Sequence, residues 1–461
     1  MAAVNRSKQL GESRISSLLI QFSLPAMVGM IVNASYNVVD RIFIGHGIGT
    51  LGIAGVTIGF PMMLVMMAFA MLIGLGGAAL ISIKLGEQKH DEAEKVLGNG
   101  MVLLVITSLT ISILGLLFLD PLLRLFGSTI DILPYARDYM RIIIGGAVFQ
   151  GVSFGANAYI RAEGNPRIAM ATMLIGAGLN AILAPIFIFI FHWGMTGAGL
   201  ATVTAQMVSA TWVLLYFLTG QSHIVLRRDC MRLKASIAKK IVAIGSAPFA
   251  MQIAGSVLMI VLNHSLEKYG GDTAIGAMGI VMAISMMIMM PVFGINQGSQ
   301  PIIGFNYGAR KYDRVIRTLQ LAIMGATLIV CCGYILIRLF PTWMIGLFNS
   351  KDIALITMGS HALTTYLTLL PLIGFQVVCS SYFLAVGKPK LSMILTLSRQ
   401  VIFLLPALLI LPRYFGLNGV FYAGPCADLL SSILTGIFIA SEMRLLHRQH
   451  NEPQNQIVNQ S

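Results

Sequence analysis

The feature that most constrains this chain is a series of long apolar segments, each separated from the next by a short polar stretch. A helix needs about 20 mostly apolar residues to cross the hydrocarbon of a bilayer. Segments of this kind lie near residues 15–40, 51–83, 96–119, 133–160, 168–192, 196–219, 241–266, 273–305, 315–340, 355–385, 391–412 and 417–441. The sequence therefore predicts an all-α polytopic membrane protein with twelve transmembrane helices. The second and eighth segments are long enough to be tilted or bent.

Composition and charge support the same class of protein. Only 11% of the 461 residues are charged, against about 25% in soluble globular domains, and the mean hydropathy is +0.82. The formal net charge of +13 comes from cations in short patches between apolar segments, an arrangement typical of membrane loops rather than of a nucleic-acid surface. Most Lys and Arg fall on one side when the N-terminus is cytoplasmic. We therefore expect both termini in the cytoplasm and the chain in the inner (plasma) membrane.

The two halves of the chain resemble each other at an offset of 222 to 224 residues. Pro25 corresponds to Pro248, the stretch 159–167 (YIRAEGNPR) to 382–390 (YFLAVGKPK), and 194–197 (GMTG) to 416–419 (GLNG). Six spans in each half give both halves the same orientation. The expected fold is thus two six-helix lobes related by a pseudo-twofold axis along the membrane normal, with a substrate cavity between them that opens by alternating access.

This repeat defines the predicted domains. Residues 1–220 form the N-lobe, 221–240 a basic cytoplasmic linker, 241–444 the C-lobe and 445–461 a cytoplasmic tail.

An acidic residue inside the first span is the main candidate functional group. Asp40 shares one helical face with Asn33, Tyr36 and Asn37, so a polar stripe runs along an apolar helix. Burying an ionised carboxylate is costly, so such a residue can bind and release a proton, or hold Na⁺ with neighbouring oxygens. The alternatives are a structural salt bridge to Arg41 or a position at the outer water interface.

Several motifs resemble those of the multidrug and toxic compound extrusion (MATE) family of antiporters. They are Pro25, Asn33-x6-Asp40, 160–166 (IRAEGNP), 300–309 (QPIIGFNYGA) and 386–389 (VGKP). The likeness extends over essentially the whole chain and is strongest to the branch of bacterial drug exporters. It implies efflux of organic, often cationic, compounds against a proton or sodium gradient.

The resemblance also implies an N-lobe cation site. Asp40 on the first span, Asn180 on the fifth and Thr202 on the sixth match its positions, but Ala184 stands where the family has an Asp before Pro185. Alanine offers a cation no ligand, whereas a proton needs only one carboxylate, so the departure favours H⁺ over Na⁺. It also raises the possibility of a transporter with impaired coupling.

Two further groups lie within the spans. Arg399 and Asp428, on the eleventh and twelfth spans, are expected to compensate each other as a structural pair, the alternative being a direct role toward substrate or proton. Methionines at corresponding places in the repeat are candidates for lining a promiscuous cavity, because thioethers repack around different ligands, or are simple packing residues. These are Met63, Met66, Met67, Met286, Met287 and Met290.

Taken together, the sequence predicts a secondary active multidrug efflux antiporter that exchanges amphiphilic, cationic organic compounds for H⁺ or Na⁺. A flippase for a lipid-linked precursor on a related fold is the alternative, and it predicts a strongly cationic cavity. No phosphate-loop, zinc-protease or CxxC motif occurs, and we expect neither an enzyme nor a bound cofactor or structural metal. The expected partners are small organic substrates, the coupling ion and the lipid bilayer, with no nucleic acid, and the functional unit is expected to be a monomer.

Overall fold

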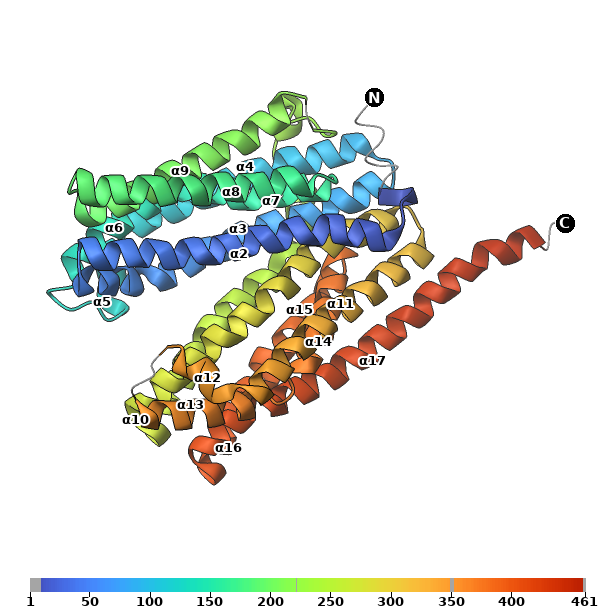
Figure 1. The fold of residues 1–461 in the computed structure, drawn as a ribbon. Helices are drawn as coiled ribbons and strands as arrows, with labels where there is room; N and C mark the ends of the chain where they lie inside the picture. The colour runs from blue at the N-terminus through green and yellow to red at the C-terminus, as the bar shows by residue number, and fades with distance from the viewer. Residues whose placement is uncertain (1–9, 221, 349–351, 459–461) are drawn as a thin grey trace. The chain divides into compact units, whose positions relative to one another are not determined.

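The computed structural model describes residues 10–220, 222–348 and 352–458, which are almost entirely helical and contain no strand (Figure 1). The first half comprises α2 (Ile15–Gly47), α3 (Thr50–Gly86), α4 (His90–Leu117), α5 (Leu119–Leu125), α6 (Leu133–Gly145), α7 (Ala147–Ala162), α8 (Pro166–Pro185), the π-helix η1 (Ile186–Ile190) and α9 (Gly194–Leu218). The 3₁₀ turn η2 (Arg228–Met231) precedes the second half. That half comprises α10 (Ala235–Gly308), α11 (Tyr312–Leu339), α12 (Pro341–Gly346), α13 (Ile353–Tyr366), α14 (Leu370–Ala385), α15 (Pro389–Leu397), the π-helix η3 (Ser398–Leu404), α16 (Leu405–Phe415) and α17 (Leu417–Val458).

The predicted all-α, twelve-span fold is confirmed. In the described residues, ten helices are long and apolar enough to cross a membrane, and two bent pairs bring the number to twelve. The long element α10 contributes two of these ten helices, because its backbone is non-helical at Gly271. The two are Ala235–Gly271 and Thr273–Gly308.

The bends occur in spans that length alone did not single out. The fourth span breaks by 54° between Leu133–Gly145 and Ala147–Ala162, and the tenth breaks by 51° between Ile353–Tyr366 and Leu370–Ala385. The second span, α3, is one helix despite Pro61, and Thr273–Gly308 is also counted as a single unbroken span. The length of an apolar segment indicates whether the segment can span the bilayer, but it does not indicate where the helix bends.

The backbone repeats the pattern seen in the sequence. Four residues with positive φ in the first half recur about 222 residues later in the second half. The pairs are Gly49 and Gly271, Gln88 and Arg310, Gly164 and Gly387, and Gly194 and Gly416. The π-helices η1 and η3 also occupy matching spans, the fifth and the eleventh. The two halves therefore share local backbone geometry as well as residue types.

The chain forms two compact units. The first is built mainly from Val28–Phe249, and the second from Ser13–Met27 together with Ala250–Ser461. The start of the first span thus belongs to the second unit, and the start of the seventh span belongs to the first.

Glycines allow these helix segments to pack closely within their units. In the first unit, a Cβ on Gly245 would overlap the backbone of Leu72 on α3. In the second unit, a Cβ on Gly298 would overlap Ser23 on α2. Larger residues at either glycine would separate the two backbones.

The linker that joins the halves is held against the first unit. The side chain of Asn99 on α4 donates to the carbonyls of Cys230 at 3.1 Å and Arg232 at 3.3 Å, and accepts from the Lys234 amide at 2.7 Å. Glu94 accepts from the Val225 amide at 3.1 Å. The helix α10 begins at Ala235, inside the stretch predicted as linker, and α17 extends to Val458, inside the predicted tail.

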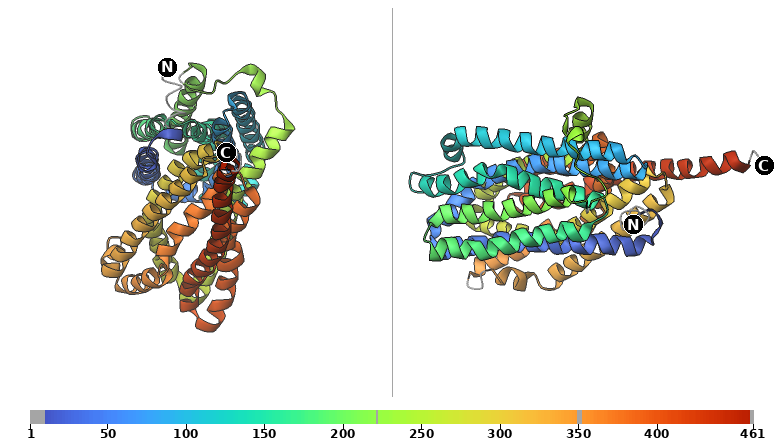
Figure 2. Two further views of the ribbon diagram at one scale, coloured as in Figure 1. Left: turned by 90° about the vertical axis from the view of Figure 1, so that its right-hand side faces the viewer. Right: turned by 90° about the horizontal axis from the view of Figure 1, so that it is seen from above.

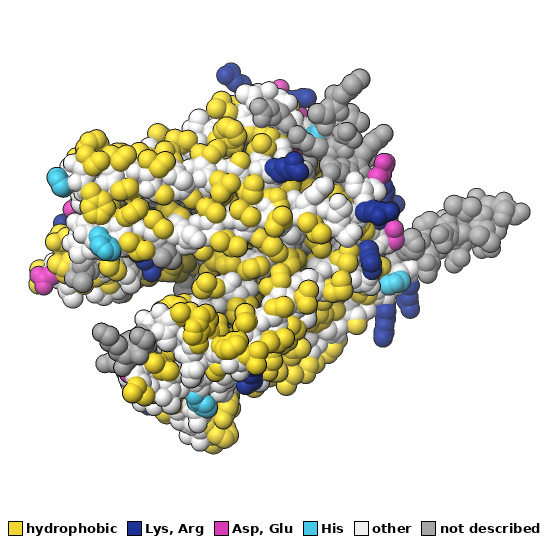
Figure 3. Space-filling model, in the orientation of Figure 1, with side chains coloured by type: hydrophobic (Ala, Val, Ile, Leu, Met, Phe, Trp, Pro, Cys, Tyr) yellow, Lys and Arg dark blue, Asp and Glu magenta, His cyan; other side chains and the backbone are white. Residues whose placement is uncertain are grey.

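The surface is that of a membrane protein. On the face in Figure 3, hydrophobic side chains cover the sides of the helices, whereas Lys and Arg gather mostly near helix ends. Figure 2 shows the helices of the first unit, from blue to green, running alongside one another with their ends at similar levels. This distribution leaves the helix sides apolar enough to face lipid.

Candidate functional site

Close packing of α2 against α8 brings the polar stripe of the first span to the fifth. A Cβ on Gly29 would overlap the Met173 side chain, and a Cβ on Gly47 would overlap Ile188. Asp40 lies on α2 between these two contact points. Small residues at such positions let two helix backbones approach, so the intervening side chains on α2 and α8 come together.

Helices α8 and α9 also meet through paired polar contacts. Asn180 on α8 donates through Nδ2 to Thr202 Oγ1 on α9 at 3.2 Å. Further along the same helix pair, Ser209 Oγ donates to the Thr172 carbonyl at 3.4 Å. Thr202 Oγ1 itself donates to the Ala198 carbonyl one turn earlier, at 3.2 Å. The two predicted residues on the fifth and sixth spans are therefore in direct contact.

Tyr36 connects this pair to the acidic residue. Its side chain lies within hydrogen-bonding reach of Thr202 and Asn180 and interacts electrostatically with Asp40, one turn further along α2. Asp40, Asn180 and Thr202 are 7%, 2% and 1% exposed. The structure thus brings together four residues from α2, α8 and α9, which we call the Asp40 site.

The Asp40 carboxyl has no cation bonded to it in the described part of the chain. Its Oδ1 is buried without a hydrogen-bond partner, and no ion pair joins Asp40 to Arg41. The Arg41 guanidinium instead lies over the Phe60 ring, 5.8 Å from its centroid. The structural salt bridge considered from the sequence is therefore not what the structure contains.

A second buried oxygen in the site also has no hydrogen-bond partner, the Oδ1 atom of Asn180. Buried polar atoms of this kind are rare in folded proteins and call for an explanation, such as a water, an ion or a proton. Both atoms are acceptors. They fit a positively charged species or a donor, and they do not fit an anion.

The substituted position limits what that species can be. Ala184 is fully buried in the apolar core of the first unit, with Ile44, Met66 and Ile188 in the same cluster. A hard cation is bound by several oxygen ligands, and the alanine side chain supplies none. The residues present fit a proton better than Na⁺, which would depend on Asp40, Asn180, Thr202 and backbone carbonyls.

Sequence reasoning missed one member of the site. Tyr139 on α6 is 1% exposed, lies within hydrogen-bonding reach of Thr202 and interacts electrostatically with Asp40 and Tyr36. Its helix is packed against α9, where Gly199 leaves room for the Tyr139 carbonyl. A tyrosine inside the predicted fourth span could have been noticed in the sequence. Residue spacing along the chain does not show, however, that the fourth span packs near the first.

The other two residues of the polar stripe, Asn33 and Asn37, are not placed in the Asp40 site. Asn33 is partly buried on α2, and its side chain is not without a partner. Asn37 lies on the same helix, but its side chain is outside the described residues.

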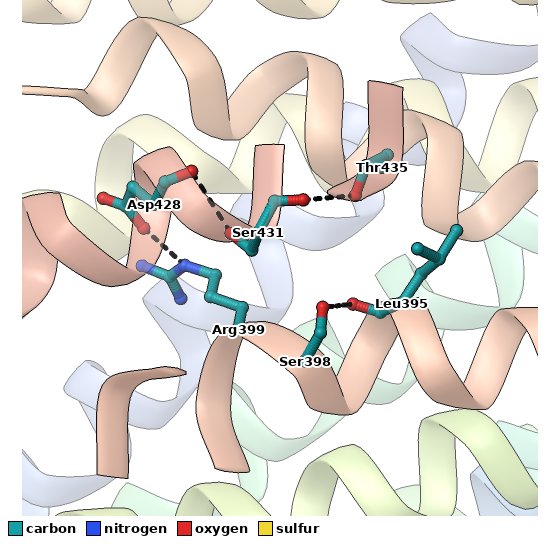
Figure 4. Close-up of polar contacts among 6 residues, drawn as sticks. All are labelled: Leu395, Ser398, Arg399, Asp428, Ser431 and Thr435. Carbon is teal, nitrogen blue, oxygen red and sulfur yellow. Dashed lines mark hydrogen bonds and ion pairs between the residues drawn. The ribbon is translucent and has the colours of Figure 1, made fainter. Parts of the chain in front are cut away.

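The second unit contains the other intramembrane carboxylate. Arg399 Nε donates to Asp428 Oδ1 at 2.6 Å, between η3 and α17 (Figure 4). Ser431 Oγ donates to the Asp428 carbonyl at 3.2 Å, and Tyr366 on α13 interacts electrostatically with both members of the pair. The two residues are therefore in contact, as expected for a compensating pair.

The candidate cavity methionines differ in their surroundings. Met66 and Met290 are buried, and Met63 and Met67 are intermediate. Met286 and Met287 are 54% and 72% exposed. Met66 belongs to the apolar core of the first unit and Met63 packs against it. The role of the methionines in a substrate cavity stays a prediction.

The sequence profile of the MatE family matches this chain twice, over residues 25–186 and 248–409, once in each half. Among known proteins, the multidrug export protein MepA of Staphylococcus haemolyticus is 26% identical, over 94% of this chain and 95% of its own length. MepA of Staphylococcus aureus (strain MRSA252) is also 26% identical, over 93% and 94%.

Solved structures match over nearly the whole fold. The MATE multidrug transporter DinF-BH, in complex with R6G, is 42% identical, with a TM-score of 0.89 and coverage of 96% of this chain and 99% of that one. A MOP superfamily transporter from Pyrococcus furiosus is 26% identical, with a TM-score of 0.90 and the same coverage. Since the family profile covers most of the chain and both repeats, this protein belongs to the MatE family of membrane transporters, as its motifs indicated.

Proposed function

We propose that this chain is a secondary active multidrug efflux antiporter that exports amphiphilic, cationic organic compounds in exchange for H⁺. Proteins that match this chain over more than nine-tenths of its length are named multidrug export proteins. The solved structure of a more similar relative, DinF-BH, is a complex with R6G. The observation that carries the coupling assignment is the buried Asp40 carboxyl, with an unpartnered oxygen and no bonded cation.

The chemistry of the Asp40 site favours a proton. Burial opposes the charged form of a carboxyl, and no guanidinium is bonded to this one to offset that cost. Protonation removes the charge with a single particle and supplies an O–H donor to a site rich in acceptors. A sodium ion would require more oxygen ligands than the site offers once alanine occupies position 184.

Coupling follows when the proton has different affinities for the two orientations of the transporter, because a ligand shifts an equilibrium only through such a difference. We infer that protonation of Asp40 from outside rearranges the helices of the first unit and favours substrate release. Loss of the proton toward the cytoplasm then restores the state that binds substrate.

The same proposal includes topology. The charge distribution supports both termini in the cytoplasm and residence in the inner (plasma) membrane. Each unit carries its own intramembrane carboxylate, which is consistent with a functional monomer.

Transport by the purified full chain in proteoliposomes tests the function. A pH gradient is expected to drive accumulation of a monovalent cationic dye, and an equal Na⁺ gradient is expected to have no effect. One proton exchanged for one monovalent cation moves no net charge, so the membrane potential, worth about 2.3 kcal/mol per charge per 100 mV, contributes nothing. A Na⁺-driven flux would overturn the coupling assignment, and a dye-dependent current would overturn the stoichiometry. Dye flux without counterflow would indicate a channel.

A further inference from the structure

The Arg399–Asp428 pair uses only part of the hydrogen-bonding capacity of the guanidinium. Arg399 donates through Nε to one carboxylate oxygen at 2.6 Å. In the part of the chain that the structure describes, no hydrogen bond or ion pair reaches either terminal nitrogen, and Figure 4 draws both without a contact. A guanidinium has five N–H groups in a fork that matches carboxylate and phosphate oxygens, so four of them are still available.

The two partners also differ in exposure. The Asp428 side chain is 1% exposed, whereas the Arg399 side chain is 25% exposed. A charged side chain inside a span is costly against lipid, so the exposed part of Arg399 must face a polar or water-filled space. The acid is enclosed by protein, and the exposed area of the pair belongs almost entirely to the arginine.

The fold does not require a charge pair at these positions. The motif offset of 223 residues places Gly176 of the first half opposite Arg399, and the offset of 222 places Gln206 opposite Asp428. The first unit builds the same two spans with no charge at either position. A purely structural role therefore leaves unexplained why the second unit bears the cost of burying a guanidinium.

The local backbone sets Arg399 apart as well. It is the second residue of the π-helix η3, and π-helical turns occur frequently at functional sites because the extra residue redirects a side chain. The matching π-helix in the first half, η1, contains only apolar residues.

From these observations we propose that the terminal nitrogens of Arg399 bind an anionic oxygen group, a carboxylate or a phosphate, carried by an amphiphilic molecule. Asp428 holds the guanidinium in place through Nε and is a positioning residue. This proposal rests on the proposed export function and extends its substrates from cations to zwitterions, unless the anionic group belongs to a lipid headgroup.

A matched pair of dyes distinguishes these roles. Rhodamine 6G is an ethyl ester with a cationic ring system, and its free acid carries the same ring system and a carboxylate. Binding of each to the full chain in phosphatidylcholine nanodiscs is measured by fluorescence anisotropy. The variant Arg399→Gln/Asp428→Asn removes both charges and leaves no unpaired ion, and Arg413→Gln, at the exposed end of α16, is the matched loss of one cation elsewhere.

A lost charge-assisted hydrogen bond corresponds to about 10- to 100-fold in affinity. We expect the double variant to bind the free acid at least tenfold more weakly and the ester within about twofold of wild type, with Arg413→Gln unchanged for both. In a second arm, detergent-solubilised protein is titrated with short-chain phosphatidylglycerol and phosphatidylcholine. Arg399-dependent binding of phosphatidylglycerol alone would identify the anion as a lipid headgroup.

The proposal is overturned if the double variant changes the affinities for acid and ester in parallel and phosphatidylglycerol binding does not depend on Arg399. Failure of wild type to bind the ester would count against the proposed export function, while the free-acid and lipid arms would still decide the role of Arg399.

Discussion

Asp40 and Asp428 are two carboxylates inside spans of one repeat, and their surroundings are opposite. Asp40 is 7% exposed, has an unpartnered oxygen and lies among an amide, a threonine and tyrosines. Asp428 is 1% exposed and accepts a hydrogen bond from Arg399 at 2.6 Å. Both are buried, but among the residues that the structure describes a cation is hydrogen-bonded only to Asp428.

This difference indicates which acid can change its charge during transport. A carboxylate bonded to guanidinium is stabilised in its ionised form, so protonating it would leave the cation uncompensated. A buried carboxyl with no cation hydrogen-bonded to it lacks this obstacle, because its neutral form is the less costly one to bury. Asp40 is therefore the better candidate for binding and releasing a proton, and Asp428 for a fixed structural or positioning role.

The largest expected effect follows from removing the titratable group of the Asp40 site. Asp40→Asn keeps shape and polarity but cannot exchange a proton, so pH-driven dye transport in proteoliposomes should fall to background. The fold should survive, because an amide is less costly to bury than a charge, and thermal unfolding in detergent checks this. Asp120→Asn, at an exposed acid outside the spans, is the matched control. Full drug resistance in cells expressing Asp40→Asn would contradict the assignment.

Removing Asp428 should reduce stability rather than coupling. Asp428→Ala leaves the Arg399 guanidinium without its partner, and breaking a buried pair in this way costs about 3–5 kcal/mol. The partial exposure of Arg399 places the expected loss of unfolding free energy near the lower end of that range. The unfolding midpoint in detergent measures it. The exchange Arg399→Asp/Asp428→Arg should recover most of the loss, and failure to do so would argue against a stabilising pair.

Restoring the missing acid should change the ion response of the Asp40 site. Ala184→Asp adds a carboxylate one helical turn after Asn180 on α8, and we expect Na⁺ to become a stabilising ligand. At a Na⁺ concentration ten times its Kd, linkage predicts about 1.4 kcal/mol of added stability. The unfolding midpoint as a function of NaCl, against choline chloride at equal ionic strength, measures the effect. Ala184→Asn controls for volume, and an equal Na⁺ response of wild type would show that Ala184 is not the limiting position.

The smallest effect is expected for an exposed ion pair between Asp120, which lies outside the spans on α5, and Arg137, near the start of the fourth span. The hydrogen bond from Arg137 lowers the pKa of Asp120 below its ordinary value, with Nη2 and Oδ2 2.5 Å apart. A lowered folded-state pKa contributes stability above the unfolded-state pKa and loses it as the pH falls through the folded-state pKa. Both side chains are more than two-fifths exposed, so solvent and salt screen the pair.

Asp120→Asn should therefore shift the unfolding midpoint much less than Asp428→Ala does, and the shift should vanish in acid and at high salt. A change as large as that of Asp428→Ala would mean that exposure does not separate the two ion pairs.

Much of the architecture was predictable because its determinants are local in the chain. The twelve spans follow from the length of each apolar segment. The repeat follows from paired motifs such as YIRAEGNPR and YFLAVGKPK, and the glycine in each of these motifs, Gly164 and Gly387, has a positive φ in the structure. Asp40, Asn180 and Thr202 were identified by resemblance to a family. Segment length did not indicate the sharp breaks, which lie near Gly146 and Leu367 in the fourth and tenth spans.

The sequence by itself determined the number and type of the spans. Each apolar segment in hydrocarbon must satisfy its own backbone hydrogen bonds as a helix, and its length decides whether it can cross the bilayer. The tertiary structure alone decided that Arg41 lies over Phe60 and that Tyr139 joins the Asp40 site. It also decided that the two terminal nitrogens of Arg399 have no hydrogen-bond partner among the described residues. Those outcomes depend on how closely helices distant in the chain approach and on which side chains compete for one partner. No pattern along a single helix contains that information.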